Sequence, residues 1–170
     1  MEAAGSTPEP LLEAIRRLEP DLTARLELVF AGPLSAREQE LLRADDLSGI
    51  VKILGWLDRP NVLALQRAAD SLLVVTEGPS RRSVATGKVF EYLNARRPIL
   101  VLGEGTEAAR IVLEAGAGIA TSATDPTQIE AALRSLLTDA PSVDGSDRAL
   151  ERYTYPRLVA RLAEVIEEVV

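Results

Sequence analysis

The residue types best suited to chemistry gather in one short segment, residues 86–91. If a helix begins at Thr86 and Gly87, its first backbone N–H groups have no partner inside the helix and can bind a phosphate. Lys88 would lie in the first turn, where the helix dipole disfavours a cation, and a bound anion would explain its place there. Glu91 follows one turn later, and its carboxylate can accept hydrogen bonds from a pair of sugar hydroxyls. The spacing therefore indicates a site for a phosphate and a sugar.

The same spacing also fits an ordinary solvated helix face. Val89, Phe90 and Leu93 would then face the core, and Lys88 and Glu91 would be exposed to water. On spacing alone this second interpretation is slightly favoured, because the pattern is common in helices without a ligand. Both interpretations stay open at this point.

Composition excludes several classes of catalytic site. The 170-residue chain contains no His and no Cys, which rules out Cys/His zinc sites, cysteine nucleophiles and Ser-His-Asp triads. A general base would have to be a carboxylate, a Tyr or a Lys, or come from another polypeptide. We therefore expect no cofactor and no set of metal ligands.

Charge and hydropathy favour a cytoplasmic protein that does not bind nucleic acid. The formal net charge is −7, and such a surface repels a phosphate-rich polymer. No apolar run approaches the ~18 residues of a membrane span. The first residues, MEAAGS, lack the apolar stretch of a signal peptide.

Predicted strands and helices alternate along the chain. Ser35 with Glu38, and Asp125 with Gln128, predict capped helix starts. The alternation predicts right-handed βαβ units, hence a Rossmann-like three-layer α/β/α fold with a mostly parallel sheet. Ligands bind at the carboxyl ends of the strands in such sheets. The predicted strands are residues 25–31, 50–54, 71–75, 98–102 and 118–121.

The chain is expected to form one domain followed by a tail. Residues 1–137 would be the Rossmann-like domain, and residues 138–147 a linker rich in Pro, Gly, Ser and Asp. Residues 148–170 would form a helical segment that packs on the domain, with a break at Tyr155 and Pro156.

The segment TGKVFEYLNARRPILVLGEGTEAARIVLEAGAGIA, residues 86–120, resembles the donor-binding half of GT-B glycosyltransferases of the retaining, glycogen-synthase-like group. That group has a helix with an EA or EYLA signature followed by a G-x-P-V/I strand, which corresponds here to FEYLNARRPIL. The resemblance runs in order from Pro8 onward. Its other parts are LELVFAG, IVKILGWLDRPNVLALQRAADSLLVVT, GAGIATSATDPTQIEAALRSLL and the closing YTYPRLVARLAEVIEEV.

The resemblance implies a role for the carboxylate of Glu91. Glu91 matches the second glutamate of a paired motif, which binds the ribose of a nucleotide sugar. The first glutamate, which contacts the hexose, would fall at Ser83. Because Ser83 is not acidic, the sugar and the activity stay open.

The resemblance also assigns the diphosphate and the nucleobase. Thr86 and Gly87 match the amides near the donor diphosphate, with Lys88 beside them. Gly55, Trp56 and Leu57 match the loop beside the nucleobase. Trp56 can stack on a base, although a lone Trp beside a strand end is more often part of the core or its rim.

Three charged loop residues are weaker candidates. Arg81 and Arg82 can neutralise phosphate charge. Arginine doublets recur elsewhere in the chain, however, so solvated side chains are the commoner case. Glu104 is expected to be a plain loop carboxylate.

Two parts of the full GT-B fold are missing from the expected domain. The acceptor site and the usual catalytic groups belong to a separate N-terminal domain. The first strand of the donor domain, normally central in the sheet, would precede Pro8, and residues 1–7 do not form it. We therefore expect either an N-terminally truncated domain or a sheet completed by pairing between chains, as in a homo-oligomer.

Together these features predict a donor-binding domain that is inactive alone. In the full enzyme it would bind the nucleoside-diphosphate sugar from which a hexosyl group is transferred. The alternative is a non-catalytic α/β module for assembly, derived from the same fold. Ser83 favours this alternative, whereas Lys88 and Glu91 favour the transferase.

Overall fold

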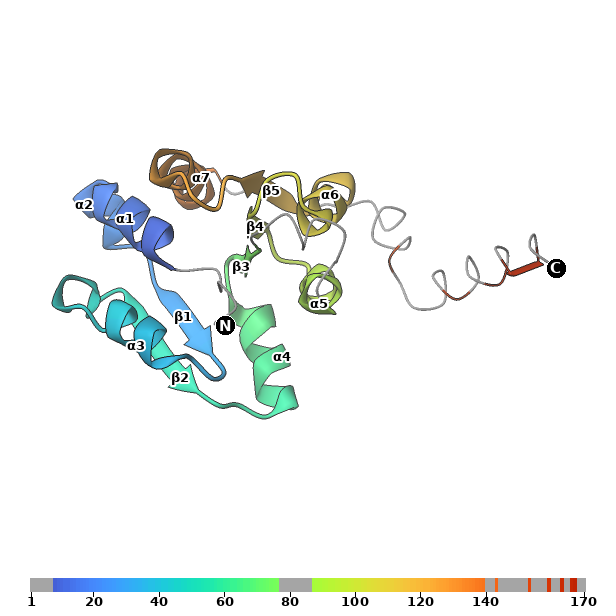
Figure 1. The fold of residues 1–170 in the computed structure, drawn as a ribbon, viewed down its shortest axis with the longest axis horizontal. Helices are drawn as coiled ribbons and strands as arrows, with labels where there is room; N and C mark the ends of the chain where they lie inside the picture. The colour runs from blue at the N-terminus through green and yellow to red at the C-terminus, as the bar shows by residue number, and fades with distance from the viewer. Residues whose placement is uncertain are drawn as a thin grey trace, which may run out of the picture.

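The computed structural model describes residues 8–76 and 87–139, and single positions between residues 143 and 167. Strands and helices alternate through this part of the chain, which confirms the predicted α/β class (Figure 1). In chain order the elements are α1 (Glu9–Arg17), α2 (Pro20–Thr23), β1 (Leu28–Ala31), α3 (Ala36–Leu42), the short 3-10 helix η1 (Asp45–Leu47), β2 (Val51–Gly55), α4 (Arg59–Ala68), β3 (Leu72–Val75), α5 (Gly87–Ala95), β4 (Ile99–Leu102), α6 (Glu107–Glu114), β5 (Gly118–Thr121) and α7 (Pro126–Thr138).

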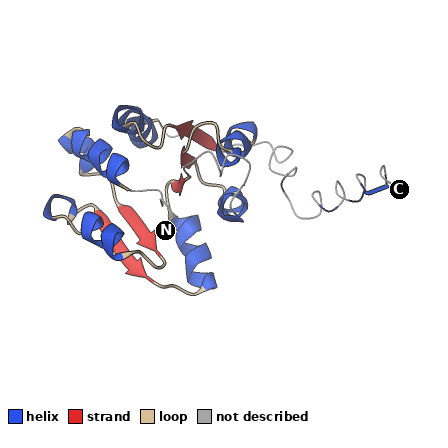
Figure 2. Ribbon diagram, in the orientation of Figure 1, coloured by secondary structure: helices blue, strands red, loops and turns tan. Residues whose placement is uncertain are grey.

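The described strands form two parallel sheets. β1 pairs with β2, and β3, β4 and β5 pair in that order, all in parallel. Figure 2 shows the strands in two separate groups. Figure 1 shows that β1 is the strand of its sheet nearer to β3. The parallel Rossmann-like layers are thus as predicted, but the sheet is interrupted between β1 and β3.

The interruption leaves two strand edges without a partner among the described residues. Leu28 and Gly32 donate their backbone N–H groups to carbonyls of the β2 segment at 2.8 and 2.7 Å. Because bonding alternates along a parallel strand, the N–H of Val29 points to the opposite edge. In the same way, the N–H groups of Leu73 and Val75 point away from β4. Both edges can accept another strand.

One apolar core lies against both sheets despite the interruption. Leu12 and Ile15 of α1 and Ile129 of α7 belong to the same buried cluster as Leu102 of β4, and Phe30 of β1 packs against it. Burial of this shared cluster holds the two sheets together. A second cluster covers the opposite face of β3 and β4, beneath α5 and α6; it includes Leu72, Val74, Val89, Ile99, Val101 and Val112.

Side-chain caps fix two of the helix starts. Ser35 and Glu38 form the predicted reciprocal capping box, with N–H to oxygen distances of 2.7 and 3.2 Å. Asp125 caps α7 as predicted. The Gln128 side chain, however, donates to the Asp125 carboxylate at 2.9 Å, so it does not accept the backbone N–H that a capping box requires.

The first strand is shorter than the predicted residues 25–31. The short helix α2, which the sequence analysis did not predict, ends just before it. The N–H groups of Arg25 and Leu26 bond back to carbonyls of α2 at 3.1 Å each, so these residues continue the turn. The strand therefore begins only at Leu28.

Most of the predicted linker and tail lies outside the described residues. Tyr153 is described: its hydroxyl donates to Glu114 of α6 at 2.9 Å, and its ring centroid lies 6.2 Å from that of Phe90. Tyr153 thus contacts the helices that cover one face of the three-stranded sheet. None of the helices in the described part is long and apolar enough to cross a membrane.

Gly103 allows the carboxyl ends of β3 and β4 to approach closely. Its φ is +146°, and an added Cβ would lie 2.3 Å from the backbone oxygen of Thr76. We predict that Gly103→Ala lowers the free energy of unfolding by more than about 2 kcal/mol, because a rotamer change cannot relieve a clash with backbone. Gly105→Ala is the matched control: φ is +74°, but nothing lies within 4 Å of its Cβ. It should lose only about 1 kcal/mol. Equal losses in urea denaturation would contradict the prediction.

Asp125 makes the cap of α7 sensitive to pH. Its carboxylate accepts the N–H groups of Thr127 and Gln128 at 2.9 and 3.4 Å. These bonds hold the pKa of Asp125 below its ordinary value of 3.8. A lowered folded-state pKa contributes stability above the unfolded-state value, and this contribution is lost as the pH falls through the folded-state value.

We predict that Asp125→Asn flattens the acid limb of the stability curve, because asparagine caps a helix without titrating. The measurement is the urea midpoint between about pH 5 and about pH 2. The midpoint of the unaltered chain should fall further than that of the variant. Parallel curves would show that this carboxylate contributes nothing to the pH dependence.

Candidate functional site

The fold brings together two of the segments that the sequence analysis singled out. The first runs from Gly55, the last residue of β2, into the start of α4. The second is α5, which carries Gly87, Lys88 and Glu91. α4 and α5 contact each other (Figure 1), so a long side chain at the start of α4 can reach α5.

An ion pair between Arg59 and Glu91 links the two segments directly. Arg59 Nη2 lies 3.3 Å from Glu91 Oε1, and the two side chains are 75% and 34% exposed. This distance exceeds the ~2.7–2.9 Å of a strong charge-assisted hydrogen bond. Exposed pairs of this kind contribute roughly 0.2–1 kcal/mol. Glu91 is therefore held by a weak contact that a ligand can share or replace.

The start of α5 is open to approach from outside. The helix begins at Gly87, as predicted, and both Gly87 and Lys88 are exposed. A Cβ at Gly87 would meet nothing within 4 Å. Lys88 lies three residues before Glu91, which puts their side chains on neighbouring positions of the helix surface.

The segment after β2 presents an aromatic ring to solvent. Gly55 has a φ of +69°, and its carbonyl accepts the N–H of Gly32 at 2.7 Å. Trp56 is 79% exposed, and Leu57 is half-buried. Trp56 therefore does not lie in the core, and its ring is available for contact with a ligand or partner.

Four of the predicted residues lie outside the described residues: Ser83, Thr86, Arg81 and Arg82. Their predicted roles stay predictions. Glu104 is exposed in the turn after β4, which is the place expected of a plain loop carboxylate.

Tyr92, next to Glu91, is no general base at neutral pH. Burial raises the pKa of its hydroxyl, and the negative charge of Glu91 raises it further. The phenol stays protonated.

The described chain offers little to a metal ion. Within residues 8–76 and 87–139, no group of three or more His, Cys, Asp or Glu side chains is arranged to hold a metal ion.

Sequence reasoning missed Arg59, although a signal for it was present. Arg59 follows the N-cap Asp58 and opens a helix with no acidic residue in its first turn. A cation in that position is disfavoured by the helix dipole. The same argument singled out Lys88, and it applies equally to Arg59. Arg59 contacts the Glu91 carboxylate, and Lys88 precedes Glu91 by about one helix turn on α5.

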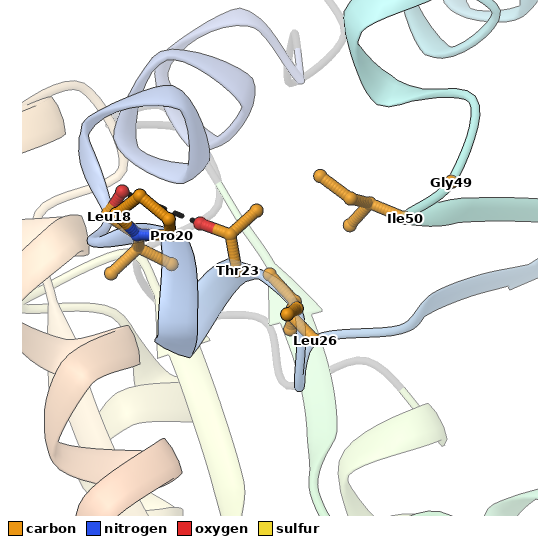
Figure 3. Close-up of a pocket in the computed structure, with 7 residues that line it drawn as sticks. Leu18, Pro20, Thr23, Leu26, Gly49 and Ile50 are labelled. Atoms are coloured by element: carbon orange, nitrogen blue, oxygen red, sulfur yellow. Dashed lines mark hydrogen bonds between the residues drawn. The ribbon is translucent and has the colours of Figure 1, made fainter.

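A hollow at the surface of the described structure lies away from these residues. It has a volume of about 510 Å³ and lies at the amino ends of β1 and β2, opposite to the ends that lead toward Arg59 (Figure 3). Its lining is mostly apolar, and the hydroxyl of Thr23 donates within it to the carbonyl of Leu18 at 3.4 Å. It contains none of the predicted site residues; its lining is Leu18, Pro20, Thr23, Ala24, Leu26, Gly49 and Ile50.

Comparison with protein families gives one match: the family described as glycosyl transferases group 1 matches residues 7–139. Comparison with curated proteins gives no match.

Several solved structures are similar to the chain. HepE of Anabaena, solved in complex with UDP, has a TM-score of 0.74 at 17% identity, over 98% of this chain and 46% of its own. WaaG, a glycosyltransferase involved in lipopolysaccharide biosynthesis, has a TM-score of 0.65 at 24% identity, over 85% of this chain and 38% of its own. AviGT4, a glycosyltransferase involved in avilamycin A biosynthesis, has a TM-score of 0.68 at 20% identity, over 98% of this chain and 49% of its own. The chain thus spans less than half the length of each of these structures.

Proposed function

Because the chain belongs to the group 1 glycosyl transferases, we propose that it is the donor-binding domain of a glycosyltransferase of the GT-B fold. The donor is a nucleoside-diphosphate sugar, from which a hexosyl group passes to an acceptor. HepE has been solved with UDP, with UDP and glucose, and with UDP-glucose, which supports a uridine nucleotide as the first donor to test.

One observation carries the proposal: the Arg59–Glu91 contact joins the segment assigned to the nucleobase to the helix assigned to the ribose and diphosphate. A nucleotide needs those three subsites next to one another. In this arrangement Glu91 accepts the ribose hydroxyls, and Trp56 and the backbone around Gly55 lie beside the base. Gly87 and Lys88 face the diphosphate at the start of α5, where a helix favours negative charge.

The chemistry of these residues is electrostatic. A glycosyl transfer leaves a nucleoside diphosphate as the departing group, so negative charge develops on the phosphate oxygens. Backbone N–H groups at the start of α5 and the ammonium of Lys88 stabilise that charge. Because the groups proposed here only bind the donor, the acceptor and the remaining catalytic groups come from another domain, and residues 8–139 alone transfer no sugar.

We propose that the interrupted sheet is the surface for partners. The edges of β1 and β3, which have no strand partner within residues 8–76 and 87–139, would receive a strand from another part of the transferase or from a second copy of the chain. Ser83, where the family carries a glutamate, leaves the rival function of a non-catalytic assembly module. That module would keep the strand-pairing surface and lack nucleotide affinity. The protein is expected to act in the cytoplasm, without a cofactor or nucleic acid.

We predict that the chain binds UDP and that Glu91→Gln weakens the affinity about tenfold or more, because hydrogen bonds to a charged group contribute about 1.5–3 kcal/mol. The measurements are titration calorimetry and the fluorescence of Trp56, the single tryptophan of the chain. Glu40→Gln, an exposed position on α3, is the matched control and should leave the affinity unchanged. If no UDP, GDP or ADP sugar binds the unaltered chain, the assembly module replaces the transferase.

We predict that the purified chain self-associates through the edges of β1 and β3 when no other strand is supplied. Val29→Pro should reduce this association, because proline removes the outward N–H of β1 and leaves the bonds to β2 intact. Light scattering after size exclusion, over a range of concentrations, gives the oligomeric state. A monomer at all concentrations, or a variant that associates as strongly as the unaltered chain, would rule out pairing through this edge.

A further inference from the structure

The start of its own helix offers Arg59 no free carboxylate to pair with. The Asp58 carboxylate next to it is occupied as the N-cap of α4 and accepts the N–H of Asn61 at 3.0 Å. The first turn of α4 contains no acidic residue. The guanidinium extends across to α5 and meets Glu91 Oε1 at 3.3 Å. The side chain is thus directed at Glu91 by a contact between helices rather than by its local sequence.

The contact uses only part of each group. Arg59 approaches one carboxylate oxygen through one terminal nitrogen. The other oxygen of Glu91 keeps its lone pairs for a second partner. The contact favours the Glu91 rotamers that meet Arg59 and so reduces the rotamer freedom that Glu91 would lose on binding a ligand.

We propose that Arg59 is a positioning residue, which holds the Glu91 carboxylate in the orientation that accepts the ribose hydroxyls of the donor. This inference rests on the function proposed above and names the group that prepares its ribose contact. Arg59 acts through Glu91 and does not bind the diphosphate, which is left to Lys88 and the start of α5. The substrate class that this Arg59–Glu91 arrangement fits is a ribonucleotide with both ribose hydroxyls free.

The test is a double-mutant cycle on UDP binding, measured by titration calorimetry. Arg59→Ala should weaken UDP binding about two- to fivefold, the range of an exposed ion pair. Arg59→Lys should recover part of the loss, because it keeps the charge without the planar fork. In the Glu91→Gln background, Arg59→Ala should have no further effect. Arg67→Ala, at the other end of α4, is the matched control and should bind like the unaltered chain.

A UDP analogue distinguishes a positioning role of Arg59 from direct contact between Arg59 and the ligand. UDP with both ribose hydroxyls removed should bind the unaltered chain and the Arg59→Ala variant equally, because Glu91 has nothing left to hold. If Arg59→Ala weakens this ligand as much as UDP, or if the two substitutions are additive, Arg59 contacts the phosphate and the positioning role is overturned. If the unaltered chain binds no UDP, the proposed function itself fails and this inference falls with it. Urea denaturation of each variant shows that the fold is intact.

Discussion

The structure depends on one apolar core that lies against two sheets, between which the described residues form no strand pairing. Leu12 and Ile15 of α1, Ile129 of α7 and Leu102 of β4 are nearly inaccessible to water, and Phe30 of β1 packs onto the same cluster. Hydrogen bonds of a sheet fix both the distance and the register of neighbouring strands, whereas apolar burial is non-directional. Within the described residues, the relation between the two sheets is therefore fixed by the packing of this cluster and not by strand pairing.

The candidate site is built across that same interruption. Arg59 opens the helix that follows β2, a strand of the two-stranded sheet, whereas Glu91 lies on α5, which packs on the three-stranded sheet. α4 connects the two, and its contact with α5 brings the charged groups together. The position of α4 relative to both sheets therefore sets the Arg59–Glu91 contact.

The sequence was sufficient wherever a local pattern decided the structure. The alternation of apolar strands and amphipathic helices predicted the α/β class. The residue types Thr86 and Gly87 predicted that α5 starts at Gly87. The interruption of the sheet agrees with the expected absence of the central first strand, an expectation that came from the family resemblance and not from a local pattern. The Arg59–Glu91 pair was not predicted, because the two residues are 32 positions apart and no local pattern indicates such a contact. Trp56 shows the same limit, because a lone tryptophan after a strand carries no local signal of whether it is buried.

Because the chain as a whole is negatively charged, only residues close to a bound nucleotide can attract its phosphates. A chain with a net charge of −7 repels a nucleoside diphosphate at long range. At physiological ionic strength, however, this repulsion is screened within about 8 Å, so the charges within one helix turn of the ligand decide the outcome. Lys88 is exposed in the first turn of α5, three residues before Glu91, and Gly87 is exposed at the positive end of the α5 dipole. The carboxylate that would repel the phosphates is occupied by Arg59 on one oxygen. Within one turn of α5 an acidic chain thus exposes a cation and the positive helix end beside a carboxylate, which is the arrangement that the proposed nucleotide site requires.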